Sequence, residues 1–265
     1  MLASQRQEHV LATVRAHGAA RVADLVADLD VSDMTVRRDI AELARAGLVR
    51  RVHGGAVALD TPARSTEEPG FEAKRTWASA EKTGVARAAL ATVEPGQSLA
   101  LSAGSTTWLL ASLLAADPGL RPLTVVTNGL RVADALHGAD DVEVVLTGGV
   151  RTPSDALVGP VADATLHGLR VDRTFLGVHG LDADGPTTPN LAEAATDRAL
   201  VGCAAATTVL ADHTKWGVVG LARICGYDLV DTLVVDTGLA ADARAHLGAA
   251  VDRLVLAAPS PGDPL

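Results

Sequence analysis

The sequence predicts an α/β protein in which a small, mainly helical module precedes a larger domain built on a mainly parallel β-sheet. A chain of 265 residues has room for a module of about 60 residues and a core-forming domain of about 200. Apolar residues make up 48% of the chain, mostly Ala, Val and Leu, which supplies a sizeable core. Helical periodicity dominates up to residue 58, whereas short apolar runs alternate with helical stretches beyond residue 83.

Three helices are expected in the N-terminal module. Apolar residues over positions 10–14 recur at helical spacing, and Gly18 provides a C-cap for this first helix. A second short helix is expected over residues 22–29 and is followed by a tight turn. Ser32 is the predicted N-cap of a third helix, which runs to a stop signal at Gly47.

The third helix has one apolar face and one polar face. At about 100° per residue, Val36, Ile40 and Leu43 form a buried stripe. An exposed Arg/Thr face on the second of two helices joined by a short turn is typical of a recognition helix in the DNA major groove. Arginine side chains on such a face can bind phosphates or guanine edges. The opposite, exposed side comprises Met34, Arg38, Ala41 and Arg45, and Thr35 and Arg37 flank it.

The segment after the third helix is predicted to be a two-stranded wing. Residues 48–57 alternate loosely between apolar and polar side chains and contain a Gly-Gly turn. Arg50, Arg51 and His53 would approach the DNA backbone from this wing. A simpler interpretation is a small helical bundle whose arginines are merely solvated. The predicted DNA-binding residues are Ser32, Met34, Thr35, Arg37, Arg38, Arg45, Arg50, Arg51 and His53.

The charge distribution restricts DNA binding to the N-terminal module. The chain as a whole carries a net charge of -9, which is unfavourable for a nucleic-acid binder. Residues 1–57, however, hold eight Arg against seven Asp and Glu, about +1, which leaves 15 minus 25, or -10, for the remainder. Any contact with DNA phosphates is therefore expected from the N-terminal segment.

Cysteine content and hydropathy indicate a cytoplasmic protein. Cys203 and Cys225 are too few for a disulfide framework and lack the clustered spacing of a zinc site. The N-terminus is polar, and no segment reaches the roughly 18 uninterrupted apolar residues of a membrane span. We therefore expect a reducing compartment and no association with a membrane.

The remainder of the chain divides into a linker, a second domain and a tail. A winged helix-turn-helix over residues 1–58 is followed by a polar linker at 59–81, an α/β effector-sensing domain at 82–258 and a flexible tail at 259–265. Apolar runs bounded by polar turns alternate with helices in the second domain, which favours a mainly parallel sheet covered on both faces. The expected strands are 98–101, 123–127, 142–147, 174–178, 207–211 and 232–235.

Ligands of such sheets usually bind beyond the carboxyl ends of the strands, so the loops there are candidate binding segments. The loop 102–107 places a glycine and consecutive hydroxyls at the start of an amphipathic helix, where backbone N–H groups and the helix dipole favour a phosphate. Such residues also serve as ordinary caps and packing turns. Lys215 would add positive charge, and Asn190 and Glu193 suit sugar hydroxyls. The predicted effector-binding residues are Ser102, Gly104, Ser105, Thr106, Thr107, Thr127, Asn128, Gly148, Gly149, Asn190, Glu193, Asp212 and Lys215.

These motifs resemble the DeoR family of transcriptional regulators over residues 4 to 238. The resemblance implies that the pair Arg37 and Arg38 faces DNA, that Asp39 is a structural partner, and that the second domain binds a phosphorylated sugar in a fold related to ribose-phosphate isomerases. Ser102 departs from the family pattern, in which many members have Asp. The motifs that carry the resemblance are residues 31–40, 47–56, 125–128, 146–149, 175–177, 187–194 and 210–217.

Two other functions compete with a regulator. An isomerase-like enzyme would use Glu193, Asp212 and Lys215, but the strand that carries an Asp-Gly-Ala-Asp segment in related isomerases corresponds to residues 176–179, which lack both carboxylates. A metal sensor would use a set without fixed spacing, namely His179, Asp182, Asp184 and His213. We therefore predict a non-enzymatic repressor that needs no cofactor, binds double-stranded operator DNA as a homo-oligomer, and responds to a phosphorylated sugar.

Overall fold

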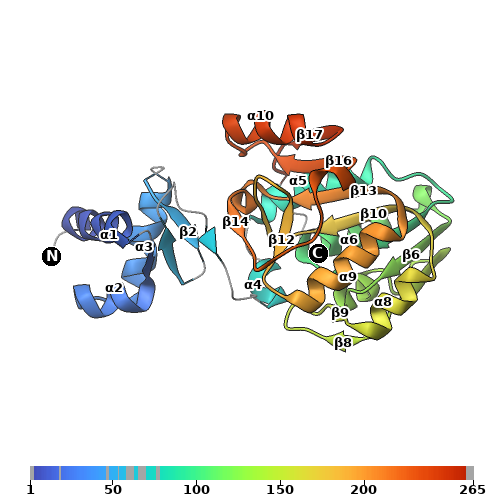
Figure 1. The fold of residues 1–265 in the computed structure, drawn as a ribbon, viewed down its shortest axis with the longest axis horizontal. Coiled ribbons are helices and arrows are strands. Elements are labelled where there is room, and N and C mark those ends of the chain that lie inside the picture. The colour runs from blue at the N-terminus through green and yellow to red at the C-terminus, as the bar shows by residue number, and fades with distance from the viewer. Residues whose placement is uncertain are drawn as a thin grey trace. The chain divides into compact units, whose positions relative to one another are not determined.

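The computed structural model describes residues 3–17, 19–45, 48–52, 54–57, 63–64, 70–75 and 78–260. The predicted cap positions Gly18 and Gly47, the wing residue His53, most of the expected linker and residues 261–265 of the tail lie outside these ranges. The chain forms two compact units, Met1–Ala63 and Arg64–Leu265, and each is described by itself (Figure 1).

The N-terminal unit contains the three predicted helices and a small antiparallel sheet. The wing strands are joined by an unpredicted third strand, and the sheet order is β1-β3-β2. Val10, Leu25 and Ile40 are among the buried residues that form a core between the helices. The elements are α1 (Ala3–His17), β1 (Ala19–Arg21), α2 (Val22–Leu29), α3 (Asp33–Arg45), β2 (Arg50–Val52) and β3 (Gly55–Val57).

The recognition helix α3 begins where the sequence predicts. Ser32 Oγ accepts a hydrogen bond from the backbone N–H of Thr35 at 3.3 Å, which satisfies one of the free donors at a helix start. Val36, Ile40 and Leu43 are buried, as the predicted apolar stripe requires. In the wing, a Cβ on Gly55 would lie 2.1 Å from the carbonyl oxygen of Ala20, so the close approach of β1 and β3 requires glycine there.

The second unit is built on a seven-stranded sheet with the order β17-β16-β13-β10-β5-β6-β7. All of its paired strands are parallel, which confirms the predicted α/β class. Six strands coincide with predicted ones, and the edge strand β17 is an addition. The strands are β5 (Ser98–Leu101), β6 (Leu123–Thr127), β7 (Val142–Leu146), β10 (Val171–Gly177), β13 (Ala204–Ala211), β16 (Thr232–Asp236) and β17 (Arg253–Ala257).

Helices cover both faces of this sheet (Figure 1). Consecutive residues of β10 point to opposite faces, so that Phe175 packs in one cluster with α5, α6 and α7, whereas Leu176 packs in another with α10. A third cluster packs α8 and α9 against the sheet. The helices are α4 (Phe71–Arg75), α5 (Ser79–Leu90), α6 (Ser105–Ala116), α7 (Leu130–Ala135), α8 (Pro160–His167), α9 (Leu191–Gly202) and α10 (Ala241–Ala250).

Short elements complete the chain. The helix α4 and the first turn of α5 fall within residues 59–81, so this stretch is not a linker throughout. Among the described residues, no helix has both the length and the apolar character needed to cross a membrane. The remaining elements are β4 (Ala63–Arg64), β8 (Val150–Arg151), β9 (Leu157–Val158), β11 (Gly180–Leu181), β12 (Pro186–Thr188), β14 (Val218–Val219), β15 (Ala222–Arg223) and the 3-10 helices η1 (Pro118–Leu120), η2 (His213–Lys215) and η3 (Tyr227–Leu229).

Candidate functional site

A polar pocket lies at the carboxyl ends of the central strands of the sheet. The strand order reverses between β5 and β10, because the chain continues from β5 towards β6 and β7 but from β10 towards β13 and β16. Such a switch point opens a crevice between the loops that leave the two strands. The loop after β5 supplies Gly104, Ser105 and Thr106 to the pocket, and the segment 177–179 after β10 lies beside it.

The loop after β5 presents the start of α6 to this pocket. Gly104 has a φ of +155° and directly precedes this helix of 12 residues. Two other predicted residues hold the loop in place instead of lining the pocket. The Ser102 hydroxyl accepts a hydrogen bond from the Gly177 N–H at 2.9 Å, and Thr107 Oγ1 donates to the Gly104 carbonyl at 3.1 Å. Ser102, at which the sequence departs from the family pattern, therefore links β5 to β10.

Asn128 braces the same loop from the neighbouring strand end and also lines the pocket. Its Oδ1 accepts a hydrogen bond from the Ala103 N–H at 2.8 Å, and its Nδ2 donates to the Leu157 carbonyl at 3.2 Å. Thr127 is fully buried, and its hydroxyl bonds the Leu101 carbonyl and the Gly129 N–H. Thr127 thus shapes the loop without reaching a ligand.

Three lysines define the electrostatics of the pocket. The sequence contains 23 Lys and Arg, of which only Lys74, Lys82 and Lys215 are lysines, and all three line this pocket. Lys74 and Lys82 come from the neighbouring helices α4 and α5, whereas Lys215 comes from η2, far along the chain. A compact ammonium group is suited to a phosphate oxygen, and the α6 N-terminus adds a favourable dipole. The arrangement favours an anion.

The ammonium groups of Lys82 and Lys215 are desolvated, and like charges surround Lys82. Burial, against the attraction of Asp212 and together with the neighbouring charges of Lys215 and Lys74, lowers the pKa of Lys82 to about 8. Burial likewise lowers the pKa of Lys215. Lys82 Nζ donates one hydrogen bond, to the Lys74 carbonyl at 2.6 Å. Within the part of the chain that the structure describes, no hydrogen bond is formed by the Lys215 ammonium.

Sequence reasoning missed Lys74 and Lys82 as site residues because it searched only the loops that follow the strands. Both lysines precede the first strand of the sheet and so lie outside those loops. The structure shows that Lys82 is 2% exposed. The signal that identifies the pair is compositional, because a chain that otherwise uses arginine places its few lysines at one site.

One part of the pocket lining, the acidic wall, carries carboxylates and hydroxyl groups. Glu193 and Asp197 line it from α9, together with Ser154 from the turn between β8 and β9. Glu193 Oε1 accepts hydrogen bonds from the hydroxyls of Thr152, at 2.6 Å, and Ser154. Asn190 does not line the pocket; its Oδ1 caps α9 by accepting from two backbone N–H groups. This wall can accept hydrogen bonds from sugar hydroxyls.

The other predicted effector residues lie outside the pocket lining. Asp212 is buried, and its carboxylate accepts from the backbone N–H of Thr214 and caps η2, which carries Lys215. Gly148 and Gly149 follow the edge strand β7 with φ angles of +71° and +123°. They shape the turn towards β8, and the lining residues do not include them.

A pair formed by the partly exposed His213 and the buried Asp236 supports the loop that bears Lys215. Asp236 accepts hydrogen bonds from His213 Nδ1 at 2.9 Å and from the His213 backbone N–H at 2.6 Å. The bond to Asp236 raises the pKa of His213, while the bonds from His213 outweigh burial and lower the pKa of Asp236. Among the residues that the structure covers, no three His, Cys, Asp or Glu side chains cluster as metal ligands.

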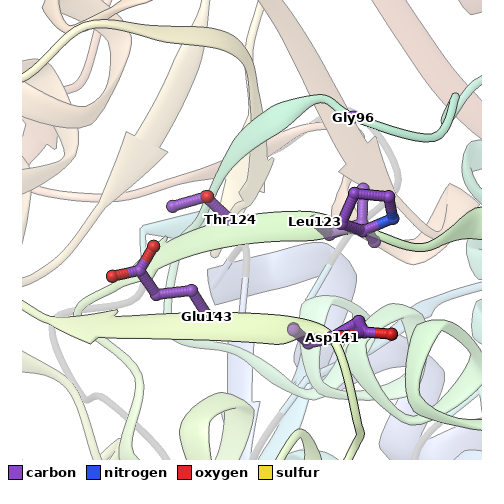
Figure 2. A pocket seen from close by; sticks show the side chains of 7 residues that line it. Gly96, Leu123, Thr124, Asp141 and Glu143 are labelled. Atoms are coloured by element: carbon purple, nitrogen blue, oxygen red, sulfur yellow. The ribbon is translucent and has the colours of Figure 1, made fainter.

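A second hollow lies at the amino ends of β6 and β7, on the edge of the sheet away from the lysines. Figure 2 shows Asp141 and Glu143 in its lining, together with Thr124. Among the residues that the structure describes, the charged side chains of its lining are the carboxylates Asp141 and Glu143, which disfavour an anion. The cationic pocket is therefore the better candidate for a phosphorylated ligand.

The N-terminal unit presents the predicted DNA-binding side chains on the surface of α3. Met34 is 78% exposed, and the side chain of Arg38 is 81% exposed. The guanidinium of Arg37 pairs with the carboxylate of Asp33, one helical turn earlier, with Nε 2.5 Å from Oδ1. Exposed pairs of this kind contribute little to stability, so phosphates can compete for the arginines. Ser32 and Arg45 are also exposed, and Thr35 is partly so.

The wing arginines differ in exposure, and Asp39 has a partner from another helix. Arg51 is exposed, whereas Arg50 is partly buried and burial lowers its pKa. Asp39 is buried and accepts hydrogen bonds from Arg6 Nε at 2.6 Å and Nη2 at 3.1 Å. This pair ties α1 to α3 and fixes the helix that carries the exposed arginines.

These features define the class of protein: a winged helix-turn-helix transcriptional regulator with an α/β sensor domain. The chain belongs to the DeoR family. Residues 6–62 match the model of the DeoR-like helix-turn-helix domain, and residues 77–237 match that of the DeoR C terminal sensor domain. The family resemblance predicted from the sequence is confirmed.

Named relatives span nearly the full chain. A candidate aga operon transcriptional repressor from Escherichia coli O157:H7 is 34% identical over 255 residues, covering 96% of this chain and 93% of the relative. The glycerol-3-phosphate regulon repressor of Escherichia coli K12 is 30% identical over 238 residues, with 89% and 92% coverage. A D-ribose-5-phosphate isomerase structure aligns with a TM-score of 0.39 at 17% identity, covering 51% of this chain and 52% of that one, which supports no functional conclusion.

Proposed function

We propose that this protein represses carbohydrate-metabolism genes and that a phosphorylated sugar or related phosphate monoester, bound among Lys74, Lys82 and Lys215, controls its binding to DNA. The observation that carries the proposal is the convergence of every lysine of the chain on the pocket at the start of α6. A phosphate dianion would neutralise the mutual repulsion of the ammonium groups and accept their N–H donors. Sugar hydroxyls would extend towards Glu193.

The names of two relatives support the assignment to phosphorylated metabolites and repression. One is named as the glycerol-3-phosphate regulon repressor and another as a candidate repressor of the aga operon. In our proposal the protein acts as a homo-oligomer whose recognition helices bind repeated half-sites. The effector shifts the population of arrangements of those helices, which requires different affinities for the two arrangements.

We propose that the pocket binds its ligand without chemical turnover. Sugar-phosphate isomerisation needs a carboxylate that moves a proton beside the carbonyl group. The strand end 176–179 offers no carboxylate, and Asp212 is buried as a cap of η2. Glu193 is held by two hydroxyl groups, which suits a fixed hydrogen-bond acceptor.

A DNA-binding titration of the full chain tests this function. The DNA would be the promoter region beside its own gene, with a scrambled fragment as control, at several salt concentrations. The titration would be repeated with ribose 5-phosphate, fructose 6-phosphate and glycerol 3-phosphate, and with their unphosphorylated counterparts. Selective binding that a phosphorylated compound alone alters would support the proposal. An absence of selective binding would contradict it and make a direct isomerase assay the next step.

Lys215→Met separates ligand sensing from DNA binding, because Lys215 belongs to the sensor unit. We expect this variant to bind the promoter like the wild type but to lose the response to phosphorylated compounds. Arg253→Gln, which removes an exposed charge from the edge strand β17, is the matched control and should respond normally. Equal loss of DNA binding and response in Lys215→Met would indicate a folding defect and would be checked by circular dichroism.

A further inference from the structure

The short helix α4 occupies a special position in the chain. The N-terminal unit ends at Ala63, and α4, at Phe71–Arg75, is the first helix of the sensor unit that follows. It also supplies Lys74 to the lining of the cationic pocket. One helix therefore both contributes to the pocket and continues directly into the segment that leads to the DNA-binding unit.

Aromatic and cationic contacts anchor α4 to the body of the sensor unit. The ring of Phe71 is 5% exposed and meets the Trp108 ring edge-on, with centroids 5.7 Å apart and an interplanar angle of 90°. The Arg75 guanidinium lies 5.9 Å from the Trp108 ring centroid. Trp108 is in the first turns of α6, whose start forms the predicted phosphate-binding loop.

A second set of contacts connects α4 to the acidic wall of the pocket. The Arg131 guanidinium lies 5.3 Å from the centroid of the Phe71 ring, and Arg131 Nε donates to Asp155 Oδ2 at 2.8 Å. Asp155 is next to Ser154, which holds Glu193. The Phe71 ring thus contacts both α6 and Arg131 without lining the pocket itself.

The attachment of α4 at its other end depends on charge. Lys82 Nζ donates to the Lys74 backbone carbonyl at 2.6 Å, which links α5 to the last turn of α4. The Lys74 and Lys215 ammonium groups both disfavour the charge on Lys82. Without an anion, like charges therefore oppose the attachment that the hydrogen bond provides. With a dianion among them, the same charges would hold the two helices together.

We propose that Phe71–Arg75 is a strap that phosphate in the lysine pocket locks against the sensor unit, and that this locking conveys ligand binding to the DNA-binding unit. The inference rests on the proposed function, because it needs the pocket to bind phosphate. Ligand binding orders α4 through Lys74 and Lys82, and the Phe71 ring keeps the strap in register with α6. When the strap is held in place, the chain segment that leads into it has fewer accessible conformations. This changes the arrangements available to the recognition helices.

Hydrogen–deuterium exchange of the full chain, with inorganic phosphate as the probe, tests the strap directly. Phosphate at tens of millimolar should slow exchange of the amides of residues 71–75 by about fivefold or more, and chloride at equal ionic strength should not. Lys82→Met should abolish this protection. Phosphate binding would be measured on the same samples by equilibrium dialysis.

Phe71→Ala tests the coupling between the pocket and α4 separately from phosphate binding itself. This variant should bind phosphate within about twofold of the wild type, because Phe71 is not in the lining, yet lose the protection at residues 71–75 and most of the ligand effect on DNA affinity. Phe71→Tyr keeps the ring against Trp108 and should restore both.

The outcomes distinguish failure of the strap from failure of the proposed function. Phosphate that binds but leaves exchange at residues 71–75 unchanged would overturn the strap and leave the ligand site intact. An absence of phosphate binding would overturn both. A Phe71→Ala protein that keeps the full ligand effect on DNA would also refute the strap, whereas loss of coupling with retained binding would support it.

Discussion

Replacing Lys82 with methionine is expected to stabilise the sensor unit at neutral pH even though it removes a binding residue. The pKa of Lys82 is lowered from 10.5 to about 8, chiefly by burial. Since one pKa unit corresponds to about 1.4 kcal/mol, the charged form costs the folded state about 3 kcal/mol at pH 7. Methionine fills a similar volume without a charge.

Loss of the hydrogen bond from Lys82 Nζ to the Lys74 carbonyl offsets part of this gain. A buried carbonyl left without its donor costs about 1–2 kcal/mol, so the net stabilisation at pH 7 is about 1–2 kcal/mol. The penalty on the wild type is present in full below pH 8. It is relieved as the pH rises from about 8 towards 10.5, because the unfolded chain then binds more protons than the folded one. The advantage of Lys82→Met should therefore close near pH 9.5.

Urea unfolding followed by tryptophan fluorescence measures this effect in the sensor unit alone, since all three tryptophans lie beyond residue 63. At pH 7 the midpoint for Lys82→Met should be higher by about 0.5–1 M, for an m-value of about 2 kcal/mol/M. Arg253→Gln removes an exposed charge and should show no such gain. A Lys82→Met protein less stable than the wild type at pH 7, or an advantage independent of pH, would refute the reasoning.

Three further predictions concern the two surfaces and the pair beneath Lys215. Arg38→Ala should lower specific DNA affinity by about 10-fold or more in a gel-shift titration with the fold unchanged, since Arg38 is exposed on the recognition helix; unchanged affinity would exclude this face. Glu193→Gln should weaken the response to phosphorylated sugars by about 10-fold but spare binding of inorganic phosphate, and loss of both would move Glu193 to the phosphate end. The stability that the His213 and Asp236 pair provides should be full below pH 6.5 and fade as the pH rises through the raised pKa of His213, so His213→Ala should flatten the pH dependence of thermal unfolding.

Local signals predicted most of the fold. The helix over 22–29 has the predicted bounds, and Ser32 caps the recognition helix because a hydroxyl at that point satisfies a free backbone donor. The strands of the sheet follow from apolar runs between helices. The strand β1 was missed because Ala19–Arg21 is too short to show a period, and its pairing with β3 depends on a glycine far along the chain.

The structure brings part of the predicted effector site together in one pocket and places its other members outside the pocket lining. Parallel strands bring their carboxyl ends together, so the loops after β5 and β6 meet at the pocket as the sequence argument requires. The sequence does not show which groups a polar side chain hydrogen-bonds. Thr127 and Asn190 have the residue types of a binding site, but Thr127 bonds the Leu101 carbonyl, which only the tertiary structure brings near, and Asn190 caps its own helix.

The choice of lysine over arginine at this pocket has a physical reason that can be tested at position 82. At pH 7 the wild type already bears the cost of one ammonium charge buried beside like charges, and Lys82 can lose that charge only above its pKa of about 8. A guanidinium stays charged at any such pH and carries five N–H donors, whereas among the described residues Lys82 Nζ donates to the Lys74 carbonyl alone. We therefore expect Lys82→Arg to destabilise the ligand-free sensor unit where Lys82→Met stabilises it, measured in the same urea titration. An arginine variant as stable as the wild type at pH 7 would show that the pocket has room and solvent for a larger cation, and the argument from burial would fail.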